Sequence, residues 1–390
     1  MKKSRYIFEN QKTKDKKIDS ELTISVVNTY FKFREFYEMA FEIYKDNNFW
    51  VAPLWVDFSG FFKSKNLFWR HAKTKLFNAY KGGKVVGRIC ATIDDLYINH
   101  INKKIGFFGF FECIKDKKVA KELLKAAEGW LKDNGMEEMH GPINGRVDIA
   151  SGFVIKGFKT VPFLIGYYSH EYYNDFVKNY KMHKCIDLVS YIIDLTKPIP
   201  EKIKQKVKEC EKKGIKIRNF SRLFFDREMK WWLKKFLAVF KDHWGYAPFS
   251  VKEIKTRFGI KELRWIIDSK LFLVAEYKGK PIGFRWTLPD YNLLFKDLKG
   301  KLGIRGIIYI LKNRKKIDRG RFIVMGIDKE YQGKGIGTCM NYYNLVEMKK
   351  RGYKSAEYGW IDENNIGSRK AGEKLGGKLY KIYRVYKKKI

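Results

Sequence analysis

One stretch decides how the chain is interpreted: Ile327-Asp328-Lys329-Glu330-Tyr331-Gln332-Gly333-Lys334-Gly335-Ile336-Gly337-Thr338. An apolar, partly β-branched run over 321–327 precedes the glycines, and helix-forming sequence follows from Cys339 to about Arg351. We therefore predict a strand, a tight loop and a helix. Glycines let the loop turn its N–H groups towards one point, and the helix N-terminus adds unpaired N–H groups and partial positive charge. The stretch predicts a pocket for a pyrophosphate.

The order of the glycines is informative about the ligand. It fits neither the Walker loop nor the G-x-G-x-x-G dinucleotide fingerprint. It resembles the coenzyme A pyrophosphate loop of the GNAT (GCN5-related) N-acyltransferases, whose pattern is Gln/Arg-x-x-Gly-x-Gly/Ala. The resemblance implies acetyl-CoA or another acyl-CoA as co-substrate and no metal. The residues that it places at the cofactor are Gln332, Gly333, Lys334, Gly335, Ile336, Gly337 and Thr338. The alternative is an ordinary glycine-rich turn.

The sequence after the loop fits the same family. A strand is predicted over Ser355–Trp360, a helix from Asp362 to about Leu375, and a closing strand over Lys378–Lys387. In GNAT proteins an Asn at the start of the last helix helps to hold the cofactor, and Asn365 fits that position. Asn is also a common helix N-cap, so a purely structural role remains the alternative for this residue.

Composition bounds the protein class. The chain has 390 residues, of which 45% are hydrophobic and 16% aromatic, so it can bury large cores. No apolar run approaches the length of a membrane span, and the basic N-terminus is not followed by a signal-peptide core. Five scattered cysteines show no metal-binding spacing and favour a reducing cytoplasm.

The net charge of +38 raises the question of an anionic partner. The chain has 18 Arg and 63 Lys, spread over nearly every segment. Proteins that recognise DNA bases rely on Arg for bidentate contacts. An excess of scattered Lys therefore favours a general bias in amino-acid composition over nucleic-acid binding as the cause of the charge. The charge also attracts an anionic cofactor.

The two halves of the chain follow one supersecondary order. Tyr80-Lys81-Gly82 matches Tyr277-Lys278-Gly279 at an offset of 197, and Gly135 matches Gly352 at 217. A repeated order at a near-constant offset indicates a duplicated domain. We predict a mobile basic tail over 1–20, a first domain over 21–197, and a second over 201–390 with a basic insertion at 291–316. The same offset places Lys115, Asp116, Lys118 and Ala120 where the second half has Gln332 and its glycines. The first domain is therefore expected to be a degenerate GNAT-like domain that does not bind coenzyme A in this way.

The whole chain resembles bacterial tandem-GNAT proteins of uncharacterised function. Motifs that carry this include Gly87-Arg88, 108–112 (Phe-Gly-Phe-Phe-Glu), 141–144 (Gly-Pro-Ile-Asn) and Trp360 with Asn365. The implied fold class is α/β (α+β), the acyl-CoA N-acyltransferase (GNAT-like) fold, with a mixed, mostly antiparallel sheet flanked by helices and duplicated in tandem.

The family mechanism implies direct attack of an amine on a bound acyl thioester. The strand before the loop would polarise the thioester carbonyl through the backbone of Met325 and Ile327. Many GNAT proteins place an acid Tyr seven residues after the helix Asn, but that position is Gly372 here. Tyr358 and Asp362 are the substitute candidates for proton transfer, with structural roles as the alternative.

These inferences predict an N-acyltransferase, with acetyl as the default group and a small-molecule or peptide amine as acceptor. Two alternatives stay open: a non-catalytic coenzyme A sensor or scaffold, and a Fem-type aminoacyltransferase that uses charged tRNA. The insertion, with an apolar run at 307–311, allows peripheral membrane contact through 299–321. The alternative is a solvated helix whose apolar stripe faces the core. The sequence defines no acceptor and no oligomeric state.

Overall fold

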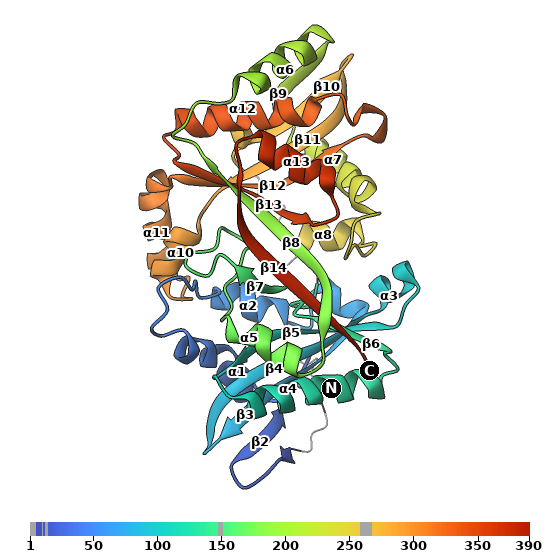
Figure 1. Ribbon diagram of the computed structural model, residues 1–390, viewed down its shortest axis with the longest axis vertical. Helices are drawn as coiled ribbons and strands as arrows, with labels where there is room; N and C mark the ends of the chain where they lie inside the picture. The colour runs from blue at the N-terminus through green and yellow to red at the C-terminus, as the bar shows by residue number, and fades with distance from the viewer. Residues whose placement is uncertain (1–4, 10, 12–14, 147–150, 258–266) are drawn as a thin grey trace. The chain divides into compact units, whose positions relative to one another are not determined.

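The structure is a computed structural model that describes residues 5–9, 11, 15–146, 151–257 and 267–390 (Figure 1). The chain forms two compact units. Unit 1 comprises 1–187, 292–312 and 382–390, and unit 2 comprises 188–291 and 313–381. No helix in the described residues is long and apolar enough to cross a bilayer.

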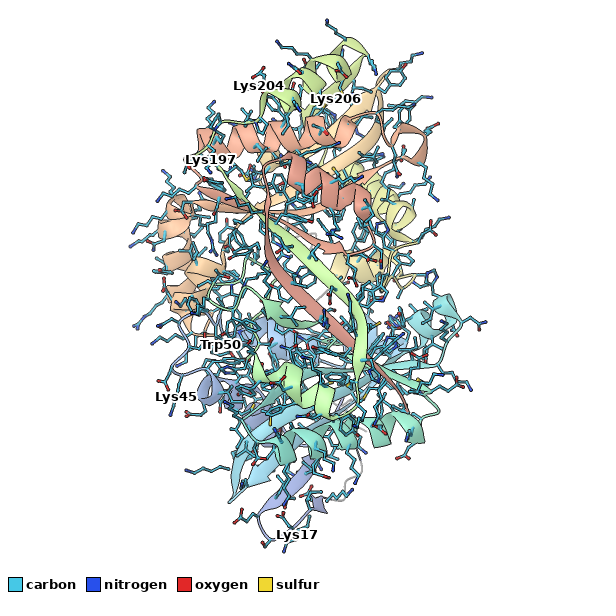
Figure 2. All side chains as sticks on the ribbon, in the orientation of Figure 1. Lys17, Lys45, Trp50, Lys197, Lys204 and Lys206 are labelled. Atoms are coloured by element: carbon cyan, nitrogen blue, oxygen red, sulfur yellow. The ribbon has the colours of Figure 1, made fainter. Side chains whose placement is uncertain are left out.

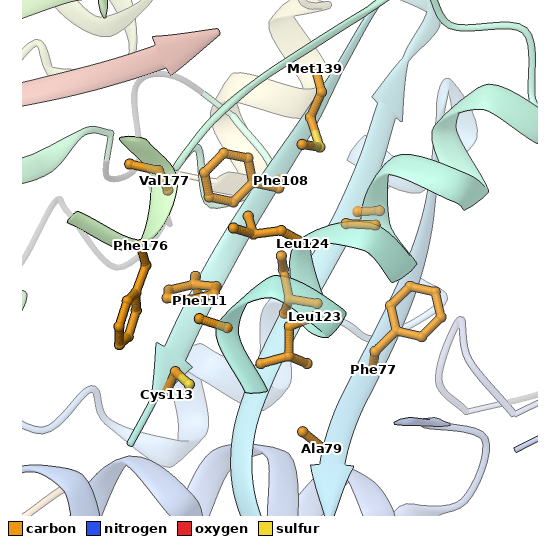
Figure 3. Packing of buried hydrophobic residues seen from close by; sticks show 14 of the residues in the cluster. Phe77, Ala79, Phe108, Phe111, Cys113, Leu123, Leu124, Met139, Phe176 and Val177 are labelled. Atoms are coloured by element: carbon orange, nitrogen blue, oxygen red, sulfur yellow. The ribbon is translucent and has the colours of Figure 1, made fainter. Parts of the chain in front are cut away.

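Unit 1 is built on an antiparallel series of strands that ends in a parallel pair. β2 (Leu22–Val26), β3 (Ala72–Lys81), β4 (Lys84–Asp94) and β5 (Ile105–Cys113) pair in sequence order. β6 (Glu138–Gly141) then runs parallel to β5. Leu123 and Leu124 of α4 (Lys117–Asp133) pack on Phe108 and Phe111 of this sheet (Figure 3). Burial of this apolar face against the sheet stabilises α4 as an amphipathic helix.

Unit 2 repeats this order. β9 (Ile215–Asn219), β10 (Phe272–Tyr277), β11 (Lys280–Pro289) and β12 (Arg319–Ile327) are antiparallel neighbours. β13 (Ser355–Asp362) is parallel to β12 and antiparallel to the 188–194 part of β8 (His183–Asp194). The helices of this unit are α6 (Glu201–Lys212), α7 (Phe225–Phe240), α8 (Val251–Arg257), α12 (Ile336–Lys350) and α13 (Ile366–Lys374).

The remaining elements complete unit 1 around its sheet. They are β1 (Lys16–Lys17), α1 (Tyr30–Ile43), α2 (Trp55–Phe61), α3 (Asp95–Ile101), β7 (Phe153–Lys156), α5 (Tyr172–Asn179), α10 (Asn292–Leu298) and α11 (Ile304–Asn313). β14 (Lys378–Lys389) pairs through its C-terminal residues with β6 and β7. The last strand of the chain therefore completes the first unit's sheet.

Strand registers refine the predicted duplication. Both hairpins have a two-residue turn, Gly82-Gly83 and Lys278-Gly279, and both have a bulge just after it. Aligning them on Lys84 and Lys280 gives an offset of 196, one less than the sequence match suggested. The same registers align Cys113 with Ile327.

Three predictions about segments need correction. The tail over 1–20 was expected to be mobile, but Tyr6 and Phe8 are buried against Phe33, because these aromatic side chains gain more from burial than the ordering costs. A helix or turn was expected around 148–156, but Phe153–Lys156 is a strand, and 147–150 lie outside the described residues. Residues 382–390 and 292–312 were assigned to the second domain, yet they pack in unit 1.

The helix expected over Val251–Asp268 is observed for Val251–Arg257. Residues 258–266 lie outside the described part of the chain.

Candidate functional site

The predicted glycine loop joins β12 to α12. A short 3₁₀ turn over Lys329–Tyr331 leads into Gln332, Gly333 and Lys334, which are exposed. The first bond of the following helix in the described residues runs from Cys339 N–H to the Gly335 carbonyl (3.1 Å). The N–H groups of Ile336, Gly337 and Thr338 therefore precede the helical ladder and face the loop. This arrangement can bind an anion.

Two glycines of the loop lie in close contact with neighbouring side chains, and one of them has a backbone conformation that favours glycine. Gly335, the N-cap of α12, has φ +87°, and a Cβ there would lie 2.7 Å from Lys206 Cε and 3.2 Å from Cys210 Sγ. A Cβ on Gly337 would lie 3.1 Å from Met325 Cε. Both positions keep the loop narrow and bring backbone N–H groups close to any bound phosphate.

Helix α6 supplies part of this site, which the sequence analysis missed. Lys206 lies against Gly335, and the Cys210 thiol donates to the Lys334 carbonyl at 3.5 Å. Figure 2 labels Lys206 on α6. Only the fold reveals that a cation of α6 adjoins the loop, because the two segments lie far apart in the sequence.

Strands β12 and β13 separate beside the loop. They pair only through Arg319–Phe322 and Ser355–Tyr358. Asp328 N–H donates to Ile282 of β11 (3.0 Å), and N–H directions alternate along a strand. The N–H groups of Met325 and Ile327 therefore point away from β11, towards the side that β13 has left. The Gln332 amide donates to the Ile327 carbonyl (3.0 Å) on that side.

Tyr358 lies where the two strands begin to separate. Its ring is buried 5.6 Å from that of Phe322, and the Arg285 guanidinium lies 4.8 Å from its centroid. Burial lowers the pKa of Arg285 to about 10, while Tyr358 acts in the opposite direction. Arg285 Nε and Nη2 have no hydrogen-bond partner in the described residues. A Cβ on Gly372 would lie 3.0 Å from Tyr358 Cδ1, so the Tyr358 ring explains why position 372 is glycine.

The other two candidates have clear structural contacts. Asp362 accepts from Asn364 N–H (2.8 Å) and shapes the turn after β13. Asn365 Oδ1 accepts from Ser368 N–H (3.0 Å), which makes it the N-cap of α13. That bond uses the Asn365 carbonyl oxygen and leaves its amide for another role.

His243 is a residue that the sequence analysis passed over. It follows α7, and its ring lies 4.8 Å from that of Phe240. Partial burial lowers the pKa of His243 below its usual value, whereas Asp362, then Asp242, act to raise it. His243 is therefore neutral at pH 7 and lies within electrostatic range of Asp362. No motif flags this residue, because the segment after α7 comes within electrostatic range of Asp362 only in the fold.

The corresponding part of unit 1 is closed. Three residues, 114–116, connect β5 to α4, whereas eight residues, 328–335, connect β12 to α12. The Asp116 carboxylate accepts from Lys118 N–H (2.9 Å) and Val119 N–H (3.2 Å), the groups that an anion would use. The gap beyond the β5–β6 pair is filled by the unit's own chain, since Ile143 N–H donates to Phe108 O (2.7 Å) and Asn144 accepts from Phe110 N–H (2.6 Å). Unit 1 thus lacks the loop altogether.

Comparison with known proteins finds a family match in part of the chain and similar proteins over most of its length. Residues 234–376 match the model of the acetyltransferase (GNAT) family. The chain is 29% identical over 354 residues to Protein YghO of Escherichia coli strain K12, covering 89% of this chain and 90% of that one. It is 29% identical over 381 residues to the bacterial ceramide synthase of Caulobacter vibrioides, covering 95% and 98%.

The fold has a solved counterpart. A tandem GNAT protein from the clavulanic acid biosynthesis pathway superposes with a TM-score of 0.55 at 11% identity, over 95% of this chain and 98% of that one. The architecture is thus the predicted GNAT fold in tandem. Residues 234–376 thus match an acetyltransferase (GNAT) domain, and the chain is similar along most of its length to two bacterial proteins, one of which is named a ceramide synthase.

Proposed function

We propose that unit 2 binds acyl-CoA at the glycine loop and transfers its acyl group to an amine. The observation that carries the proposal is the loop itself: a largely exposed eight-residue connection at the N-terminus of a helix, in which Gly335 has a left-handed backbone (φ +87°) and neither Gly335 nor Gly337 carries a side chain. Gln332, Gly333, Lys334, Gly335, Ile336, Gly337 and Thr338 would hold the pyrophosphate, and Lys206 of α6 would add positive charge.

The bound acyl-CoA supplies an activated thioester, and the chain's residues position and polarise it. The N–H groups of Met325 and Ile327 point to the open side of β12, where they can donate to a carbonyl oxygen that gains charge. The amine nitrogen forms the new amide bond as the carbon–sulfur bond breaks, and the amine proton must leave. His243, neutral at pH 7, is the proposed base, and Tyr358 beside Arg285 is the proposed acid for the departing thiolate.

The acceptor is proposed to be a long-chain amine. The support is the likeness to a protein named bacterial ceramide synthase over nearly the full length of both chains, since a ceramide is the N-acyl derivative of a long-chain amino alcohol. The direct test is thiol release from acyl-CoA by the purified chain, with a long-chain amino alcohol, a short amine and an amino-terminal peptide as acceptors. Turnover of the long-chain amine alone supports the proposal. Coenzyme A binding without turnover of any amine favours the sensor instead.

Replacing Tyr358 by Phe tests the proposed acid. We expect kcat to fall at least about tenfold while KM for acyl-CoA is unchanged, because the hydroxyl acts only as the thiolate leaves. Arg285 retains its ring contact in Y358F, so the melting temperature should change little. Unchanged kcat across acyl-CoA substrates would assign the ring a packing role only.

Replacing His243 by Gln tests the proposed base through pH dependence. Because the pKa of His243 lies below 6.5, wild-type kcat/KM should be full at neutral pH and fall as the pH drops through that pKa. In H243Q we expect kcat/KM about tenfold lower at pH 7.5, without that acid limb. An acid limb retained in H243Q would show that another group takes the proton.

A further inference from the structure

Helix α11 carries an apolar stripe that faces solvent. Its apolar positions Ile304, Ile307, Ile308 and Leu311 follow the i, i+3, i+4, i+7 spacing of one helix face. Ile304 is 79% exposed and Leu311 56% exposed, and the other two are nearly half exposed. The alternative of an apolar stripe that faces the core is therefore wrong. Only Gly306 of this helix is buried.

Basic residues surround the stripe. Exposed cations lie before the helix, on it and just after it: Lys299, Lys301, Arg305, Lys312, Lys315 and Lys316. None of these six forms a salt bridge within the part of the chain that the structure describes. An apolar stripe flanked by uncompensated cations is complementary to a surface that is both anionic and apolar.

The segment before α11 holds the helix firmly in unit 1. Asn292 Nδ2 donates to Pro162 O (3.0 Å), Lys296 Nζ donates to Asn48 O (2.6 Å), and Trp55 N–H donates to Gly300 O (2.9 Å). A Cβ on Gly300 would lie 2.3 Å from the Tyr37 hydroxyl, so the chain is close-packed there. α11 is thus presented by a fixed platform, and its exposed stripe is not a consequence of a loose insertion.

We propose that α11 is a membrane-surface helix that docks unit 1 on an anionic lipid bilayer. The stripe of Ile304, Ile307, Ile308 and Leu311 enters the headgroup boundary, and the flanking cations contact lipid phosphates. Hydrophobic contact and charge both contribute, so binding needs an anionic bilayer and weakens as salt rises. This inference rests on α11 alone and stands or falls independently of the proposed reaction.

Vesicle sedimentation with the full chain tests the proposal. Vesicles of phosphatidylcholine are compared with vesicles that contain about one third phosphatidylglycerol. We expect wild-type protein to bind the anionic vesicles and to lose this binding at least about tenfold in I304E/L311E, because two apolar contacts become like charges to the surface. Both side chains are exposed, so the melting temperature should not change.

The matched control is Leu223→Glu in unit 2, whose side chain is 86% exposed. It introduces one glutamate at an exposed apolar position of the other unit and should bind anionic vesicles like wild type, while the single variant L311E should already lose part of the binding. Equal loss in L223E would overturn the assignment to α11, as would wild-type binding to neither vesicle. A sedimentation velocity that reveals a dimer dissolved by I304E/L311E, without vesicle binding, would show that a second copy covers this face.

Discussion

Gly335→Glu is expected to abolish coenzyme A binding while the chain stays folded. The substitution forces a side chain into a backbone with φ +87°, with its Cβ 2.7 Å from Lys206 Cε, and it adds a negatively charged carboxylate beside the N–H groups that would bind the pyrophosphate. That carboxylate would occupy the place of the pyrophosphate, as Asp116 caps the equivalent helix in unit 1. Calorimetric titration should show a Kd for coenzyme A at least about 100-fold higher.

Gly352→Glu is the matched control for this variant. Gly352 follows the C-terminus of the same helix, has φ +78°, and has no atom within 4 Å of its Cβ position. It suffers a similar backbone penalty without touching the loop, so its Kd should equal that of wild type. Equal loss of binding in both variants would mean that α12 stability, and not the loop, controls affinity.

Glu357→Gln is expected to destabilise the chain more than any other single change discussed. Glu357 lies in the interior of unit 2, where its Oε2 is 3.2 Å from Arg321 Nε, and both side chains are almost fully buried. Lys381, which is also buried, interacts electrostatically with Glu357. Removing the carboxylate takes a negative charge away from two buried cations. Chemical denaturation should therefore show a free energy of unfolding that is lower by about 3 kcal/mol.

Lys381→Met is expected to act in the opposite direction. Burial lowers the pKa of Lys381 from 10.5 to about 8, with Glu357 working against it. The folded state therefore disfavours the charged ammonium: the cost is full below pH 8 and disappears as the pH rises through 10.5. K381M should be at least as stable as wild type at pH 7, and should lack the stability gain that wild type shows between pH 8 and 10.5.

The two variants check each other. K381M should restore part of the stability lost in E357Q, because it removes one of the two buried cations that interact with the Glu357 carboxylate in wild type. If E357Q is as stable as wild type, the buried charges are compensated by groups outside this pair. A K381M variant that is less stable than wild type at pH 7 would show that the ammonium, not its removal, supports the fold.

Local sequence signals predicted much of the fold. The spacing of apolar residues gave α4 (Lys117–Asp133) and α7 (Phe225–Phe240) with their observed bounds, and turn residues located both hairpins. The glycine loop was found because glycine patterns report backbone geometry directly. Long-range pairing left no such signal. Nothing local shows that the final strand pairs with β6, or that 292–312 packs in unit 1.

The candidate site divides in the same way. The loop residues are consecutive and could be predicted as a set. The other candidate residues, Lys206, Arg285 and His243, come from α6, β11 and the segment after α7, and only the fold brings these elements to the candidate site. The sequence comparison of the two halves also misjudged the first unit. It suggested replaced glycines, but the connection is five residues shorter (8 − 3 = 5), which only aligned strands reveal.

The stoichiometry of coenzyme A binding to the wild-type chain tests the central claim most directly. Unit 2 has an open loop at a helix N-terminus, and unit 1 has a capped helix and a filled gap. Calorimetric titration of coenzyme A and acetyl-CoA into the full chain should therefore give one site per chain. Two equivalent sites, or no binding to a folded protein, would contradict the account.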